Sequence, residues 1–251
     1  MNLSFGDKLK FIGCEVLYRE ACKLAAKSPY RVDVEFLRKG LHDLERNEMN
    51  ARLQSAIDAV PASEDYKAIL LGYARCNDGV SGLTARSIPL VIPKAHDCIT
   101  FFFGSRDAYQ TYFDSHPGTY YRTTGWSERN DPDVPGAQGV MQKLGLNESF
   151  EDMVAKYGRE NAEFIRNSLG GGLENYTRIC YLEMGVTDET PFIDAARCEA
   201  ENRGWQFDLR KGDWSLLHRL FFGPWNDDFL IVPPRRSLIG RNDPAILALT
   251  G

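Results

Sequence analysis

The chain has 251 residues, of which 43% are hydrophobic and 26% charged, and its net charge is −5. This composition is typical of a globular protein and excludes a mainly disordered chain. The acidic balance, without a basic stripe, argues against a nucleic-acid surface. The longest apolar runs are far shorter than the roughly 20 residues of a membrane-spanning helix, and the N-terminus lacks the apolar segment of a signal peptide. We therefore expect a cytoplasmic protein with neither nucleic-acid nor membrane partners.

Strand and helix patterns alternate along the first 125 residues. Short apolar or alternating runs predict strands at residues 8–13, 31–36, 66–72, 88–92 and 119–123. Longer runs with helical spacing predict helices at residues 15–27, 45–60 and 98–113. Asp97 is the expected N-cap of the third helix.

The second half returns to the same alternation after a polar segment. Residues 129–148 are rich in Pro, Gly, Asn and Asp and predict an irregular connection. Helices are then expected at 149–169, 191–204 and 213–223, and strands at 177–185, 205–213 and 228–234. Strand–helix alternation predicts an α/β fold of mostly parallel sheets with helices on both faces. We expect two Rossmann-like lobes, 1–128 and 149–251, or one continuous sheet with an inserted helical hairpin.

Three of the six cysteines follow predicted strands. Cys14 comes directly after the first strand, Cys76 a few residues after the third, and Cys98 after the fourth, at the start of a helix. Parallel sheets bind ligands at the carboxyl ends of their strands, where the strand order reverses. If the strands are ordered 2-1-3-4, all three thiols share one rim of the sheet. The alternative is that each cysteine simply packs in the core, as buried cysteines commonly do.

Three thiols on one rim predict a metal site. Thiolates can hold zinc with its fourth position open, or three irons of a [4Fe–4S] cluster with one iron open. Because no export signal is apparent, we expect reduced thiols and not disulfides. The helix start should lower the pKa of Cys98. His96, two residues earlier, is a candidate fourth ligand or catalytic acid or base.

Two further positions are candidates for substrate binding. Asn77 opens the turn NDGVSG (77–82), whose backbone N–H groups would cradle an anion if they faced a ligand. Arg106 would bind a substrate carboxylate in bidentate fashion. The alternatives are a simple turn and a surface ion pair.

Several segments together resemble a known family. GCEVLYRE (13–20), GYARCNDGVSGL (72–83), IPKAHDCITFFFGS (92–105), PGTYYRTTGW (117–126) and FFGPWNDDFLIVPP (221–234) resemble a bacterial and archaeal family described only as domain of unknown function 1638. The resemblance covers nearly the whole chain and falls on Cys14, Cys76, His96 and Cys98. It implies an association with corrinoid-dependent methyltransferases that act on methylamines and betaines.

These observations predict a metal-dependent enzyme or enzyme accessory. It would hold zinc or a [4Fe–4S] cluster on Cys14, Cys76 and Cys98 and act on a small polar molecule in methyl-group or one-carbon metabolism, with a corrinoid protein or methyltransferase as its partner. One alternative is a binding module that delivers a metal or corrinoid without turnover. Another is a metal-free thiol enzyme with Cys98 as nucleophile and His96 as base.

Overall fold

A computed structural model describes residues 3–76, 78–129, 154–155, 158–159, 161 and 175–250. Asn77, nearly all of the predicted connection at 129–148, and most of the predicted helix at 149–169 lie outside the described residues. None of the helices in the described part of the chain is long and apolar enough to cross a membrane.

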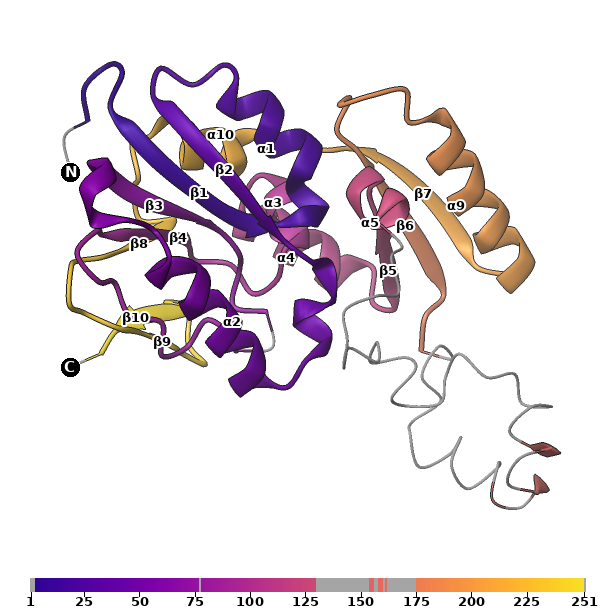
Figure 1. The fold of residues 1–251 in the computed structure, drawn as a ribbon. Helices are drawn as coiled ribbons and strands as arrows, with labels where there is room; N and C mark the ends of the chain where they lie inside the picture. Colours follow the sequence, from indigo (N-terminus) through magenta and orange to yellow (C-terminus); the bar gives the residue numbers. More distant parts are fainter. Residues whose placement is uncertain are drawn as a thin grey trace.

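A five-stranded sheet forms the larger layer of the fold (Figure 1). Its strands, in spatial order, are β2 Arg31–Leu37, β1 Lys8–Cys14, β3 Tyr66–Gly72, β4 Leu90–Pro93 and β8 Phe229–Val232. The first four are parallel, whereas β8 pairs antiparallel with β4. The predicted order 2-1-3-4 is confirmed, and so is the mostly parallel α/β class.

Helices cover this sheet on both faces, as predicted. The strand order reverses at β1, and right-handed crossovers then place the helices after β1 and β2 on opposite faces. Accordingly, α1 Tyr18–Ala25 lies with α10 Ser215–Phe222 on one face, and α2 Arg46–Asp58 lies on the other (Figure 1). Short 3-10 turns connect the elements at η1 Glu15–Leu17, η2 Lys39–Asp43 and η3 Ala62–Glu64.

A second sheet has three parallel strands, β5 Thr119–Arg122, β6 Arg178–Glu183 and β7 Gln206–Lys211. Helix α9 Thr190–Arg203 packs on it, and Pro191 and Gly204 begin and end this helix as predicted. A small core of Ile179, Tyr181, Ala196 and Ala200 lies between them. The short helix α5 Thr124–Glu128 follows β5 and contacts η1 beside the large sheet.

Each of the two sheets contains strands from both predicted lobes. β5, from the first half of the chain, pairs with β6, and β8, from the second half, pairs with β4. The finer prediction of two Rossmann-like lobes is therefore not confirmed. An antiparallel hairpin of β9 Leu238–Gly240 and β10 Leu247–Leu249, which was not predicted, lies near the carboxyl end of the chain.

The predicted helix at 98–113 is two helices, α3 Ile99–Phe103 and α4 Arg106–Ser115. Gly104 separates them in the left-handed conformation, with a φ of 73°, and its backbone lies against Asp213. Ser105 then caps α4 by accepting a hydrogen bond from the N–H of Ala108 at 3.1 Å. The bend lets the chain leave the large sheet toward β5.

Candidate functional site

The ends of β1 and β3 meet through two glycines. Gly13 is paired with Gly72, and the ring of Phe11 lies where a Cβ on either glycine would stand. A larger residue would displace this ring, so glycine permits the close approach. The chain then continues as Cys14 at the end of β1 and as Tyr73 directly after β3, which leaves the two residues beside each other at the carboxyl edge of the sheet.

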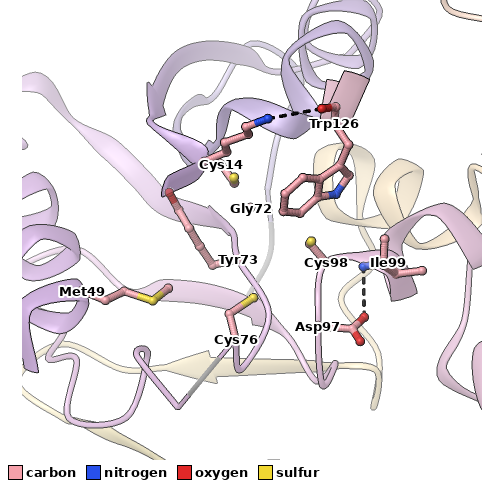
Figure 2. Close-up of a pocket in the computed structure, with 10 residues that line it drawn as sticks. Cys14, Met49, Gly72, Tyr73, Cys76, Asp97, Cys98, Ile99 and Trp126 are labelled. Carbon is pink, nitrogen blue, oxygen red and sulfur yellow. Dashed lines mark hydrogen bonds between the residues drawn. The ribbon is translucent and has the colours of Figure 1, made fainter. Parts of the chain in front are cut away.

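A cavity of about 410 Å³ opens at this edge. Its lining comprises Cys14, Lys39, Met49, Gly72, Tyr73, Cys76, Asp97, Cys98, Ile99 and Trp126. Figure 2 shows the sulfurs of Cys14, Cys76 and Cys98 turned toward the space between Tyr73 and Trp126. All three thiols are free. The structure therefore brings the three cysteines from three strand ends to one cavity, while their role as metal ligands stays a prediction.

Cys76 has an unusual backbone conformation for a residue with a side chain. Its φ is 35°, in the left-handed region that L residues rarely adopt. The N–H of Cys76 donates to the carbonyl of His96 at 3.1 Å, and its carbonyl accepts from Gly79 at 3.0 Å. These bonds tie the turn after β3 to the segment after β4, from which Cys98 comes.

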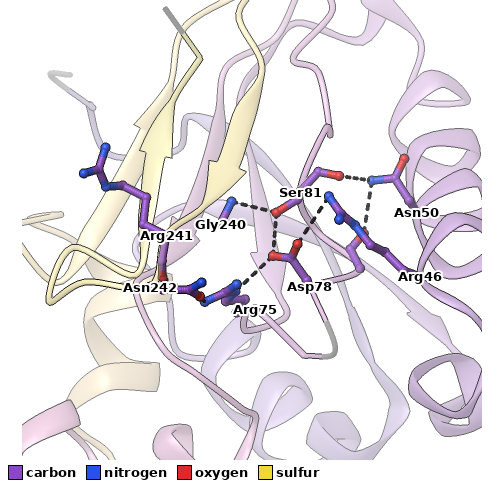
Figure 3. Close-up of polar contacts among 9 residues, drawn as sticks. Arg46, Asn50, Arg75, Asp78, Ser81, Gly240, Arg241 and Asn242 are labelled. Atoms are coloured by element: carbon purple, nitrogen blue, oxygen red, sulfur yellow. Dashed lines mark hydrogen bonds and ion pairs between the residues drawn. The ribbon is translucent and has the colours of Figure 1, made fainter.

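A polar network holds this turn from both sides (Figure 3). The carboxylate of Asp78 accepts hydrogen bonds from Arg75 Nε at 2.9 Å and Ser81 Oγ at 2.6 Å, and pairs with Arg46 of α2 at 3.2 Å. Ser81 Oγ in turn accepts from the N–H of Gly240 in the hairpin at 2.6 Å. The hairpin and α2 thus fix the position of Cys76.

Of the two alternatives for residues 77–82, the described hydrogen bonds agree with a simple turn and not with an anion cradle. The N–H groups of Gly79, Ser81 and Gly82 donate to carbonyls of Cys76, Asp78 and Leu238 respectively. They are used within the protein and do not face a ligand. Asn77, the candidate substrate-binding residue of this turn, lies outside the described residues.

Burial keeps the three thiols protonated. It raises the pKa of Cys14 to about 12 and that of Cys76 to about 12, and it raises the pKa of Cys98 well above its ordinary value. Charge on Cys76 and Cys14 would raise the pKa of Cys98 further, while Trp126 acts in the opposite direction. The expected lowering of the Cys98 pKa is therefore wrong: α3 has only five residues, and desolvation outweighs its dipole.

Lys39, Tyr73 and Trp126 also line the cavity, and their presence there was not predicted. Lys39 Nζ donates to the carbonyl of Trp126 at 3.2 Å and lies 5.5 Å from the centre of its ring. Its positive charge opposes the rise in the pKa of Cys14. Tyr73 is 3% exposed, and its hydroxyl has no hydrogen-bond partner in the described part of the chain. Burial, followed by the nearby cysteines, raises the pKa of Tyr73 well above its ordinary value.

Asp97 lines the cavity and lies two residues before α3. Its Oδ1 accepts from the N–H groups of Ile99 at 3.0 Å and Thr100 at 3.3 Å, so its side chain caps the first turn, although the N-cap position itself is Cys98 and not Asp97. Its Oδ2 accepts from the hydroxyl of Tyr109 at 2.7 Å. Burial raises the pKa of Asp97 and these hydrogen bonds oppose the rise. The segment 96–98 therefore orients Cys98 through a fixed turn.

His96 and Arg106 lie together, but in a different pocket from the cysteines. This second pocket, of about 330 Å³, is lined by both residues and by Tyr109. His96 is exposed, and Arg106 Nη1 donates to the carbonyl of Pro244 at 2.7 Å. The catalytic role of His96 and the substrate-binding role of Arg106 stay predictions. Neither residue lines the cavity that holds the three cysteines.

Comparison with known proteins identifies the family. The model of the family described as "Protein of unknown function (DUF1638)" matches residues 36–221. The chain belongs to the DUF1638 family. No curated protein and no solved structure matches it. Within the described residues of this DUF1638 protein, no group of three or more His, Cys, Asp or Glu side chains is arranged to hold a metal ion.

Proposed function

We propose that this DUF1638 protein holds a metal cofactor on the thiolates of Cys14, Cys76 and Cys98 and acts with it on a small polar molecule. The observation that carries the proposal is the convergence of three free thiols, from the ends of three parallel strands, on one cavity. Because the described residues are not arranged to hold a metal ion as they stand, the proposal requires the three thiols to move closer together on binding. Thiolates suit zinc and iron–sulfur clusters. A bound cation would also offset the burial that keeps these thiols protonated.

The cavity volume favours a [4Fe–4S] cluster over a single zinc ion. A zinc ion draws its thiolates to about 2.3 Å and fills little space, whereas a cavity of about 410 Å³ can take a cluster together with a small substrate. Three cysteines leave one iron without a protein ligand. When bound, such a cluster supplies a Lewis-acidic iron to a hydroxyl or carboxylate group of a substrate.

The other cavity residues suit that use. Lys39 adds a positive charge near Cys14, which would attract an anionic substrate group. Met49, Ile99 and Trp126 give the cavity an apolar wall. Apolar surroundings strengthen the electrostatic interactions inside such a site.

The biological setting is proposed from the family resemblance alone. Its association with corrinoid-dependent methyltransferases supports a role in methyl-group or one-carbon metabolism, with a corrinoid protein or methyltransferase as partner. A delivery module without turnover would use the same three thiols. A metal-free thiol enzyme is less well supported, because His96 lines a different pocket from Cys98.

The test is purification without oxygen followed by analysis for iron, zinc and sulfide. We expect a brown protein with iron and sulfide; stoichiometric zinc in a colourless protein would support the zinc form. Cys98→Ser should strip the metal and leave the fold intact. Cys198→Ser is the matched control, because Cys198 is exposed on α9. Full metal content in Cys98→Ser would contradict the proposed site.

A further inference from the structure

The second pocket, of about 330 Å³, has the make-up of a small-molecule site. Its volume lies within the range of roughly 300–1,000 Å³ that such sites occupy, and they typically combine apolar walls with a few polar groups. Here Pro244 and Ile246, which lie between β9 and β10, supply apolar surface together with the ring of Tyr109 from α4. His96 and Arg106 supply the polar groups. None of these residues lines the cavity of the three cysteines.

Arg106 is a half-buried cation without a counter-ion. Its Nη1 donates to the carbonyl of Pro244 at 2.7 Å, and it forms no ion pair with any residue that the structure describes. Other half-buried arginines each pair with a carboxylate: Arg19 with Glu128, Arg75 with Asp78, Arg122 with Glu199, Arg178 with Asp208 and Arg219 with Asp228. The charge of Arg106 is therefore the exception, and it borders a pocket.

The bond to Pro244 presents this guanidinium in a fixed orientation. A guanidinium has five N–H donors in a planar fork, and the two oxygens of a carboxylate match that fork. The carbonyl of Pro244 holds one nitrogen of Arg106 and leaves further donors at the edge of the pocket. Helix α4 begins at Arg106, so the positive end of its dipole adds to the attraction for an anion.

The charges around the pocket favour a ligand with a single negative charge. Asp107, which is exposed, also lines the pocket and would repel an anion there. A carboxylate carries one negative charge, whereas a phosphate monoester carries about 1.5 to 2 at pH 7. With one arginine opposed by one acidic residue, the smaller charge is the better match. The apolar surface of Pro244 and Ile246 suits a short hydrocarbon chain on the same ligand.

We propose that this pocket binds a small carboxylate with a short apolar body, held by Arg106. The proposal goes beyond the proposed function, because it assigns a second ligand site that requires no metal. It also gives the carboxylate-binding role expected of Arg106 a pocket separate from the thiols. The two linings are nevertheless connected, since Tyr109 donates to Asp97 of the thiol cavity at 2.7 Å.

The experiment is a titration of the metal-free protein with butanoate, followed by NMR of its methyl groups. Butanoate should shift the methyl signals of Thr100 and Ile246, which line the pocket, in a saturable way. Butanamide has the same shape without the charge and should not. Arg106→Gln should weaken butanoate binding about 10–100-fold, because a hydrogen bond to a charged group is lost. Arg31→Gln is the matched control, since exposed Arg31 also donates to a carbonyl, that of Gly6 at 2.8 Å, away from the pocket.

Several results would overturn the proposal. Equal butanoate affinity in Arg106→Gln and wild type would remove the role of the arginine. Equal affinity for butanamide, or tighter binding of inorganic phosphate, would contradict the carboxylate class. Shifts confined to the methyl groups of Ile99 would place the ligand in the thiol cavity instead. The comparison of ligands in the wild type decides the matter even where Arg106→Gln does not fold, and none of these results depends on whether the thiols bind metal.

Discussion

Glu20→Gln tests a buried carboxyl group on α1. Glu20 lies on α1, is 1% exposed, and has no hydrogen-bond partner for either carboxyl oxygen among the described residues. The charge of Glu189 helps to raise the pKa of Glu20. Glu189 is itself buried and accepts a hydrogen bond from Tyr181 at 3.1 Å. Arg19, the adjacent cation, is bonded to Glu128 at 2.9 Å. Glu20 therefore lies in a place that disfavours its charge.

Burial raises the pKa of Glu20 from 4.5 to about 7, with further contributions from the charges of Glu189 and Glu128. The unfolded chain therefore releases this proton near pH 4.5, while the folded protein keeps it until about pH 7. Between these values the unfolded state binds fewer protons, so stability falls as pH rises. The pKa difference corresponds to a loss of about 3 kcal/mol from pH 4 to pH 8.

Glutamine matches the size of the protonated side chain and cannot ionise. Urea denaturation of wild type and Glu20→Gln between pH 4 and pH 8 measures the effect. The variant should gain about 3 kcal/mol relative to wild type across this range. Glu48→Gln, on the exposed side of α2, controls for loss of one acidic group. A difference between Glu20→Gln and wild type that stays constant with pH would refute the reasoning.

Two other substitutions test the segments that position Cys76 and Trp126 in the cavity. Asp78→Asn weakens the contacts to Arg75 and Ser81, and should lower the free energy of unfolding by about 1–3 kcal/mol, measured in urea; it should also release metal more readily because the Cys76 turn is loosened. Gly125→Ala places a methyl group against the carbonyl of Val16. We expect about 1–3 kcal/mol of destabilisation, and an unchanged melting temperature would show that α5 does not pack there.

The fold was predictable where the apolar pattern is strong. Residues 66–72 form a strand with the predicted bounds, because the apolar run at 68–71 suits a strand buried on both faces. The direction of β8 was not predictable, since an apolar run defines a strand and not its orientation. The break at Gly104 was missed because aromatic residues continue the helical spacing on both sides of it.

The cavity was predictable only in its cysteines. Cys14 ends a strand and Cys76 and Cys98 follow strands, so the strand order brings them to one edge. Lys39 and Trp126 reach the cavity from η2 and α5, and their positions depend on tertiary contacts that no local pattern encodes. Tyr73 did carry a signal, because it directly follows β3 and so ends at the same edge as Cys14.

Cys76 shows how the surrounding fold sets the site geometry. A left-handed conformation costs a residue with a side chain on the order of 1–3 kcal/mol, and glycine would adopt it without that cost. The network around Asp78 links the Cys76 turn to α2 and to the hairpin, and these contacts offset the cost. In this conformation the sulfur of Cys76 faces the cavity (Figure 2).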